Sequence, residues 1–206
     1  MKNATKELFE ELFRRYPQLE ACRASVKSAF ETLRTCYLSG GKVLVCGNGG
    51  SAADAEHIVG ELMKAFRKPR AIPLGVASRL RPEVAARLEG ALPAVSLVSM
   101  SGILTAFAND VAWEMVFAQQ VLGLARAGDV LIALSTSGNS ADCVAAAEVM
   151  RAAGGAVVAF TGAGASRLSE QSDVVVRVPE TETRKVQELH LPVYHALCAM
   201  LEEELF

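Results

Sequence analysis

The sequence of 206 residues predicts a single α/β domain, a three-layer flavodoxin-like sandwich around a five-stranded parallel sheet. From residue 42 onward, short apolar runs alternate with stretches of helical periodicity. Strands separated by helices pair in parallel through right-handed crossovers. No apolar segment is long enough for a membrane span, and no internal repeat interrupts the alternation. We therefore expect a sheet of order 2-1-3-4-5, with extra helices in residues 1–40.

The individual elements follow from periodicity and from the residues that break it. Apolar residues recur at helical spacing in residues 4–15 and 18–39, and Pro17 and Gly40 punctuate these helices. Strands are expected at 42–46, 94–98, 129–134, 156–161 and 173–178. Further helices are expected at 51–66, 101–108, 112–125, 139–153, 165–170 and 183–205. Pro192 lies inside the last of these helices and predicts a kink or an irregular turn.

Residues 67–93, between the first crossover helix and the second strand, are longer than a usual connection of this kind. They include a segment around 79–89 that is expected to form a short added helix. One interpretation is a packing or subunit-contact element. The other is a lid whose arginines, Arg79, Arg81 and Arg87, reach the phosphate of a ligand.

Composition excludes several classes of function. A formal net charge of −2 argues against a large nucleic-acid surface. The hydrophobic content of 51% favours some apolar surface buried between subunits. Five scattered cysteines are typical of reduced thiols, and residues 1–10 lack the apolar stretch of a signal peptide. We expect a cytoplasmic protein without membrane or nucleic-acid partners.

Two loops carry the strongest functional signal: the first loop, CGNGGS at residues 46–51, and the second loop, STSGNS at residues 135–140. Each follows a predicted buried strand and begins a helix. Glycines let backbone N–H groups approach an anion, hydroxyls add donors, and the helix N-terminus adds positive potential. In the predicted sheet both loops lie where the strand order reverses, which is where ligands bind. The sequence therefore predicts a site for a phosphorylated small molecule.

The first loop also matches a loose dinucleotide-binding pattern, Gly47-x-Gly49-x-x-Ala52. That function requires an acidic residue at the end of the second strand, where it binds the ribose. Residues 98–101, Val-Ser-Met-Ser, contain none, so a nicotinamide or flavin function is disfavoured.

Two helices carry side chains that could perform chemistry. His57 and Glu61 are four residues apart, so they share a helix face and can share a divalent metal or divide acid and base roles; alternatively they are a surface pair. The last helix holds Gln187, Glu188, His190 and His195. Gln187 and His195 are eight residues apart, about 12 Å along a helix, which is a wide separation for two ligands of one ion. The spacing alone therefore does not indicate that Gln187 and His195 bind the same ion.

In these residues the chain resembles the sugar isomerase (SIS) domain family, specifically its phosphoheptose isomerase branch, and the resemblance covers nearly its whole length. The most specific motifs are residues 47–51, Asn109-Asp110, residues 128–131, residues 135–140 and residues 187–190. The resemblance implies the interconversion of sedoheptulose 7-phosphate and D-glycero-D-manno-heptose 7-phosphate through an enediol. It also implies zinc, one ion per site, and a homotetramer with active sites at subunit interfaces.

The resemblance assigns a role to each matching position. The implied substrate-binding residues are Asn48, Gly49, Gly50, Ser51, Glu61, Asn109, Asp110, Ser135, Thr136, Ser137, Ser140 and Gln187, with the four hydroxyl residues cradling the phosphate. The implied zinc ligands are His57, Glu61, Gln187 and His195, and the implied catalytic pair is Glu61 with His195. The segment 75–92 is longer than the branch leads us to expect, which leaves the identity of the sugar open.

Two other functions remain open at this stage. Some relatives bind sugar phosphates without catalysis, including a bacterial protein that associates with the replication initiator. The presence of both Glu61 and His195 favours catalysis instead. An isomerase for another ketose phosphate is the second alternative, with the segment 75–92 reshaping the pocket. Sugar-sensing transcription regulators share the fold, but residues 1–40 lack a recognisable DNA-reading module.

Overall fold

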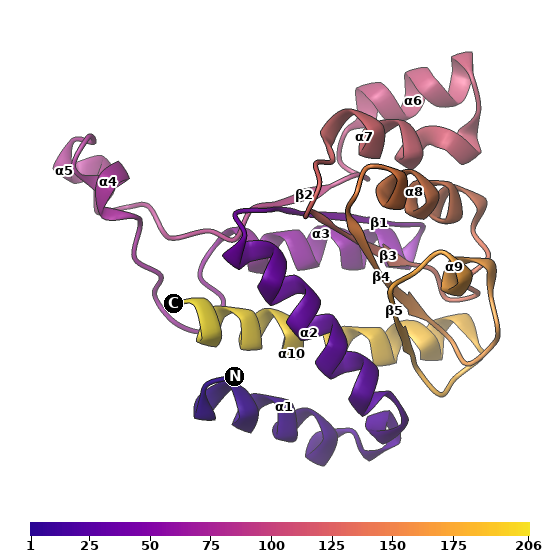
Figure 1. Cartoon of the computed structure of the whole chain (residues 1–206), viewed down its shortest axis with the longest axis horizontal. Coiled ribbons are helices and arrows are strands. Elements are labelled where there is room, and N and C mark those ends of the chain that lie inside the picture. The colour runs from indigo at the N-terminus through magenta and orange to yellow at the C-terminus, as the bar shows by residue number, and fades with distance from the viewer.

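A computed structural model describes residues 1–206, and its five strands form one parallel sheet in the order β2-β1-β3-β4-β5 (Figure 1). The strands are β1 (Val43–Gly47), β2 (Ala94–Ser96), β3 (Val130–Leu134), β4 (Ala156–Thr161) and β5 (Val174–Arg177). This confirms the predicted strand order and parallel pairing. The edge strand β2 ends two residues before the predicted boundary at residue 98. The order reverses between β1 and β3, so the two loops begin at neighbouring strand ends.

The helices match the predicted alternation. They are α1 (Asn3–Arg15), η1 (Pro17–Cys22), α2 (Arg23–Leu38), α3 (Gly50–Met63), α6 (Ser101–Asp110), η2 (Trp113–Met115), α7 (Val116–Leu124), α8 (Ala141–Ala152), α9 (Arg167–Glu170) and α10 (Thr183–Leu205). α10 remains helical across Pro192, so the predicted irregular turn does not interrupt it. Pro192 and its neighbours Val193 and Tyr194 are buried, and this packing outweighs the backbone hydrogen bond that a proline removes. None of the helices combines the length and apolar composition that a membrane span requires.

The sheet is covered on both faces, which explains its continuously apolar strands. Alternate side chains point to opposite sides: Val43 and Val45 join the core beneath α1, α2, α3 and α10. Leu44 and Cys46 join a second core beneath α7, α8 and α9. Figure 1 shows these helices on the two sides of the sheet. The three-layer sandwich predicted from the sequence is therefore confirmed.

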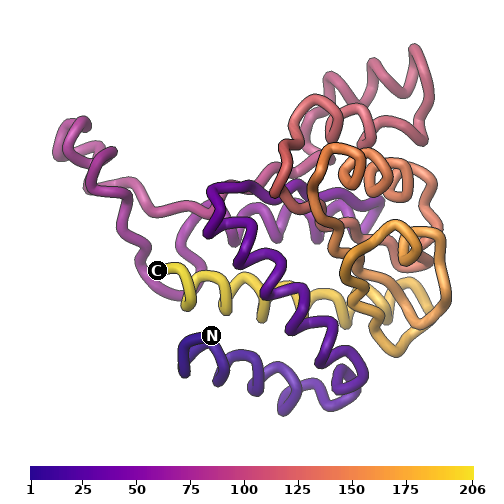
Figure 2. Tube along the Cα trace, viewed as in Figure 1, coloured from indigo at the N-terminus to yellow at the C-terminus, as the bar shows by residue number.

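The extra N-terminal helix α1 packs along α10 in the opposite direction, which brings the two chain ends together (Figure 2). Lys2 Nζ donates to the carbonyl oxygen of Glu203 at 2.9 Å, and the Glu204 carboxylate accepts from Lys2 N at 2.7 Å and from Thr5 Oγ1 at 2.9 Å. These bonds anchor α1 to the last turn of α10.

α3 ends at Met63, three residues before the predicted boundary, because tertiary contacts take over its last carbonyl groups. The Leu62 carbonyl oxygen accepts from Arg70 Nη1 at 2.6 Å and from the N–H of Leu92 at 2.9 Å. The N–H groups of Phe66 and Arg67 turn to the Glu202 carboxylate, each at 2.8 Å. A continued helix would break these bonds.

Residues 67–93, which we call the arm, leave the body of the molecule and return to it (Figures 1 and 2). The short helix predicted around 79–89 is present as α5 (Pro82–Ala85), and a second four-residue helix that was not predicted, α4 (Leu74–Ala77), precedes it; neither has a buried residue. The arm stands away from the sheet, so its arginines do not form a lid over the loops of their own chain.

Candidate active site

The first loop and the start of α3 form a bend of exposed glycine backbone at the end of β1. Gly49 adopts a φ of +56°, a conformation that favours glycine. Ser51 is buried in the first turn of α3. The Asn48 side chain is held from outside the loop, since its Nδ2 donates to both carboxylate oxygens of Asp142, at 3.0 and 2.9 Å. The N–H groups of Asn48 and Gly49 donate to no group of the chain and are available to a ligand.

The second loop gathers the hydroxyls that the sequence assigned to a phosphate. Ser135 Oγ and Ser140 Oγ are 2.9 Å apart and hydrogen-bonded, and Ser137 Oγ accepts from the N–H of Asn139 at 3.1 Å. The N–H groups of Thr136, Ser137 and Ser140 make no hydrogen bond within the chain. The loop leads into α8, whose N-terminal end adds positive potential. This is a set of donors suited to the oxygens of a phosphate group.

The two loops are neighbours. Gly47 at the end of β1 lies opposite Leu134 at the end of β3, and the Asn48–Asp142 bond joins the first loop to α8. The start of α10 closes the same region, because a Cβ added to Gly50 would lie only 2.6 Å from Gln187 Nε2. Asn109 and Asp110 are different: they are exposed at the end of α6, their side chains bond each other at 2.8 Å, and neither bonds the loops.

Gly138 gives a direct test of the second loop. Its φ is +66°, and an added Cβ would lie 2.1 Å from Ser166 Oγ and 2.4 Å from Ser166 Cβ. We expect Gly138→Ala to displace the loop, to cost about 1–3 kcal/mol of stability and to weaken inorganic phosphate binding about tenfold. Calorimetric titration and urea unfolding measure both effects. Gly164→Ala is the matched control, because nothing lies within 4 Å of its added Cβ. Unchanged phosphate binding in Gly138→Ala would contradict this account of the loop.

α3 and α10 pack side by side and run in the same direction, and this pairing builds the rest of the site. Gln187 contacts the start of α3, His195 meets His57 in its middle, and Glu202 binds the segment that follows it. Gln187 and His195, which the sequence alone could not join, therefore contact successive positions of one neighbouring helix.

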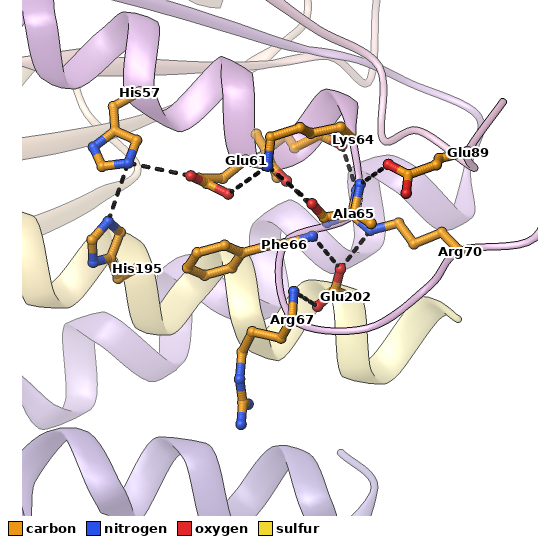
Figure 3. A network of polar contacts seen from close by, with 11 residues as sticks. His57, Glu61, Lys64, Ala65, Phe66, Arg67, Arg70, Glu89, His195 and Glu202 are labelled. Carbon is orange, nitrogen blue, oxygen red and sulfur yellow. Dashed lines mark hydrogen bonds and ion pairs between the residues drawn. The ribbon is translucent and has the colours of Figure 1, made fainter. Parts of the chain in front are cut away.

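His57, Glu61 and His195 form a cluster of donor atoms between these two helices (Figure 3). His57 Nε2 lies 3.3 Å from Glu61 Oε1 and 3.5 Å from His195 Nε2. The other Glu61 oxygen, Oε2, is buried and makes no hydrogen bond, and Lys64 Nζ is 3.5 Å from it. The structure thus brings together three of the four residues in the implied zinc set.

The cluster matches zinc in its donor chemistry and in the spacing of its pairs. Two nitrogen or oxygen ligands of a tetrahedral zinc ion, each about 2.0–2.1 Å from the metal, are about 3.3–3.4 Å apart. The two His57 separations are close to this distance. No three His, Cys, Asp or Glu side chains close around a single point as a metal-binding group, however. The remaining implied ligand, Gln187, makes no hydrogen bond to the cluster and lies against Gly50.

The His195 ring is half-buried and accessible from one side. Burial and the neighbouring His57 lower the pKa of His195, and the Glu61 carboxylate partly opposes this shift. The imidazole is therefore neutral near pH 7 and can both donate and accept a proton. The Phe66 ring lies 5.6 Å from the His195 ring. His195 also lines a cavity of about 300 Å³ that opens between α1 and α10.

Behind Glu61, a buried ion pair holds the end of α3 (Figure 3). Arg70 Nε donates to Glu202 Oε1 at 2.7 Å, and Arg70 Nη2 donates to the carbonyl oxygen of Glu61 at 2.9 Å. Both side chains are almost fully buried, at 0% and 1% exposure. Burial by itself would raise the pKa of Glu202, but its hydrogen bonds to the N–H of Phe66, to Arg70 and to the N–H of Arg67 lower it. The pair therefore fixes the backbone that carries Glu61.

Sequence reasoning missed four residues that support this site: Arg70, Glu202, Asp54 and Tyr194. Tyr194 accepts or donates a hydrogen bond at His57 Nδ1, 3.0 Å away, and donates to Asp54 Oδ1 at 3.1 Å. The one local signal was Asp54, which lies three residues before His57 and therefore on the same face of α3. The other three residues, Arg70, Glu202 and Tyr194, reach their partners across more than 100 positions of the sequence. No local sequence pattern indicates such contacts.

His190 has a structural position rather than a place in the cluster. It is fully buried, its ring lies edge-on to Phe160 at 5.5 Å, and its Nε2 is 3.3 Å from the Thr161 carbonyl oxygen. Burial lowers the pKa of His190 to about 4, with the Thr161 carbonyl opposing the shift. The imidazole therefore stays neutral in the folded protein at physiological pH.

This burial predicts a pH dependence of stability. An unfolded histidine takes up a proton below its ordinary pKa of about 6.5, whereas His190 in the folded protein does so only near pH 4. Between these values the unfolded state binds more protons, so stability falls as the pH decreases, by up to about 3 kcal/mol. We expect His190→Gln to flatten the slope of urea-unfolding free energy between about pH 7 and 5. An unchanged slope would mean that other groups cause it.

Comparison with known proteins adds the family context. The sequence matches the SIS domain family over residues 9–88 and again over residues 99–200. It is 38% identical over 188 residues to the phosphoheptose isomerase of Rhodospirillum rubrum, covering 91% of this chain and 90% of that protein. It is 42% identical over 170 residues to the phosphoheptose isomerase of Roseiflexus sp., covering 82% of this chain and 77% of that protein.

The likeness extends to the three-dimensional structure. The solved structure of phosphoheptose isomerase from Neisseria gonorrhoeae superimposes with a TM-score of 0.76 and 33% sequence identity, covering 95% of both chains. Sequence and fold therefore agree over nearly the whole chain.

Proposed function

This chain belongs to the phosphoheptose isomerase family of SIS-domain proteins, which are aldose–ketose isomerases, and we propose that it interconverts sedoheptulose 7-phosphate and D-glycero-D-manno-heptose 7-phosphate. One observation carries the proposal: the two phosphate-binding loops are neighbours at the start of α3, and the candidate proton-transfer groups lie farther along α3 and its parallel neighbour α10. Glu61 is eleven residues after Gly50, which is about 16 Å along α3. A long sugar phosphate with its phosphate at the loops extends its other end toward the cluster.

The proton transfers are assigned to Glu61 and His195. Glu61 takes the proton from C2 of the aldose while His195 donates a proton to the carbonyl oxygen at C1, which gives an enediol. Return of a proton to C1 from Glu61, and loss of the C2 hydroxyl proton to His195, then yields the ketose. The lowered pKa of His195 keeps its imidazole neutral near pH 7, so the ring has one N–H that can donate toward the carbonyl oxygen and one lone pair that can accept a proton.

We propose that His57, Glu61, Gln187 and His195 hold one zinc ion per site, which when bound supplies Lewis-acid polarisation of the sugar's carbonyl oxygen. The close approach of His57 to Glu61 and to His195 supports this proposal. Gln187 is a neutral and weak ligand, so the ion is expected to be exchangeable.

We propose further that the protein is a cytoplasmic homotetramer with its active sites at subunit interfaces. Large apolar side chains are exposed on the arm, with Leu74 at 86% exposure, and near Asn109 and Asp110, with Val111 at 65%. Such surface favours burial against other subunits. An interface at α6 brings Asn109 and Asp110 to the sugar of a neighbouring site. All five cysteines are free and buried, which is consistent with a reducing compartment.

The proposed reaction is tested by NMR-monitored conversion of a panel of five-, six- and seven-carbon sugar phosphates in D₂O. We expect conversion of the seven-carbon pair, with deuterium incorporated at C1 or C2. Faster conversion of a five- or six-carbon ketose phosphate would reassign the substrate. Binding without conversion or exchange for any member would establish a non-catalytic sugar-phosphate protein instead.

A further inference from the structure

Behind the cluster of His57, Glu61 and His195, a chain of hydrogen bonds runs from Asp54 through Tyr194 to His57. The Tyr194 hydroxyl donates to Asp54 Oδ1 at 3.1 Å and lies 3.0 Å from His57 Nδ1. Tyr194 is only 2% exposed, and the rings of Tyr194 and His57 meet edge-on at 5.6 Å. The phenol is therefore held in place by packing as well as by its two polar neighbours.

The direction of these bonds follows from a count of protons. A phenol carries one proton, and it keeps that proton near neutral pH because its ordinary pKa is about 10. Because the proton lies on the bond to Asp54, the Tyr194 oxygen can only accept at its other contact. His57 must then supply the hydrogen from Nδ1. The neutral His57 ring is thereby held as the Nδ1–H tautomer, with a lone pair on Nε2.

That lone pair lies beside the Glu61 carboxylate and the His195 ring. His57 Nε2 lies 3.3 Å from Glu61 Oε1 and 3.5 Å from His195 Nε2. A hydrogen on Nε2 would satisfy Glu61, but the bond to Tyr194 commits the imidazole proton to the opposite nitrogen. The Nε2 lone pair of His57 is therefore free to bind a cation.

We propose that Tyr194, itself fixed by Asp54, is a positioning residue that sets the tautomer and orientation of His57 so that its Nε2 lone pair is presented to a divalent metal ion. This rests on the zinc site proposed above and extends it with two residues outside the ligand set. Hydrogen bonds of this kind to a metal-binding histidine change metal affinity about 10–100-fold when they are lost.

The first readout is the protonation of the His57 ring nitrogens, measured by ¹⁵N NMR on metal-free protein at about pH 8, above the ordinary imidazole pKa. Wild type is expected to show His57 with hydrogen on Nδ1. Tyr194→Phe keeps the ring packing and removes only the oxygen, so both tautomers become populated. Asp54→Ala frees the Tyr194 hydroxyl to donate to Nδ1, which moves the His57 hydrogen to Nε2.

The second readout is the dissociation constant for Zn²⁺, measured by competition with a chelator. We expect Tyr194→Phe to weaken Zn²⁺ binding about 10–100-fold. Tyr37→Phe is the matched control, because the Tyr37 hydroxyl is buried without a hydrogen-bond partner. We expect the control to leave both the His57 tautomer and the Zn²⁺ affinity unchanged.

The proposal is overturned if His57 keeps the wild-type tautomer in Asp54→Ala, or if Tyr194→Phe binds Zn²⁺ within twofold of wild type. A wild-type protein that binds no Zn²⁺ would also overturn it. Neither readout uses a sugar substrate. A loss of the predicted isomerase activity and a failure of this inference are therefore distinguishable.

Discussion

Replacing Glu61 by glutamine is expected to lower kcat by about 10²–10⁴-fold, the usual contribution of a general base. Glutamine has nearly the same shape as glutamate but cannot take a proton from the sugar. The change leaves the main chain untouched, so the Glu61 carbonyl oxygen keeps its 2.9 Å bond from Arg70. Sugar-phosphate affinity should stay within a few-fold, because the loops that bind phosphate lie at the other end of α3.

The measurements are steady-state kinetics, calorimetric binding of sedoheptulose 7-phosphate, and deuterium exchange at C1 and C2. Glu56→Gln on the same helix is the control, since Glu56 is exposed and its carboxylate bonds Ser96 Oγ at 3.1 Å, outside the cluster. We expect near-wild-type turnover in this control. Wild-type turnover in Glu61→Gln would remove Glu61 from the reaction, and a parallel loss of binding would place it in substrate recognition instead.

Replacing Arg70 by methionine is expected to destabilise the protein by about 3–5 kcal/mol, because Glu202 is then a buried carboxylate without its cation. Three bonds are lost together: one to Glu202 Oε1 at 2.7 Å, one to the Leu62 carbonyl at 2.6 Å, and one to the Glu61 carbonyl at 2.9 Å. The last two hold the end of the helix that carries Glu61. Activity should therefore fall even at temperatures where the variant is folded.

Urea unfolding measures this effect, and a neighbouring ion pair supplies the control. Lys68 Nζ lies 3.2 Å from Glu203, and the two side chains are 33% and 28% exposed. We expect Lys68→Met to change stability by less than about 1 kcal/mol. If Arg70→Met lowers the free energy of unfolding by no more than Lys68→Met does, the Arg70–Glu202 pair does not stabilise the fold as described.

The same pair predicts acid sensitivity with a defined sign. Because its hydrogen bonds lower the pKa of Glu202, the carboxylate stabilises the folded state above the ordinary glutamate pKa of about 4.3. That contribution is lost as the pH falls from this value through the lower pKa of the folded state. Glu202→Gln should lack this loss. This pH range lies below the range in which His190 affects stability, so a series of unfolding measurements at different pH values separates the Glu202 effect from the His190 effect.

Much of the fold was predictable because its signals are local. The predicted strands at 129–134 and 156–161 differ from β3 and β4 by at most one residue, since short apolar runs bounded by glycine or loop residues mark buried strands. The order 2-1-3-4-5 follows from the alternation of strands and helices with right-handed crossovers. Both loops were placed at neighbouring strand ends for the same reason.

The errors arose where distant residues determine local structure. The end of α3 was misplaced because Arg70 and Glu202 compete for the backbone groups that a longer helix would use. The sequence did not predict α4, because none of its residues is buried, which leaves no periodic core-facing pattern. Only the tertiary packing explains the spacing of Gln187 and His195, because α3 runs beside both residues.

By itself, then, the sequence determined the class of fold, the strand order and the two anion-binding loops, because each depends on hydrogen bonds and hydrophobic periodicity within a few residues. Only the tertiary structure decided that His195 meets His57, that Tyr194 links Asp54 to the same ring, and that α3 stops at Met63. The contacts of His57 and Tyr194 join positions 137–140 residues apart. The end of α3 likewise depends on a distant residue, Glu202. Their geometry is set by how two helices pack on one sheet, and no local run of residues encodes it.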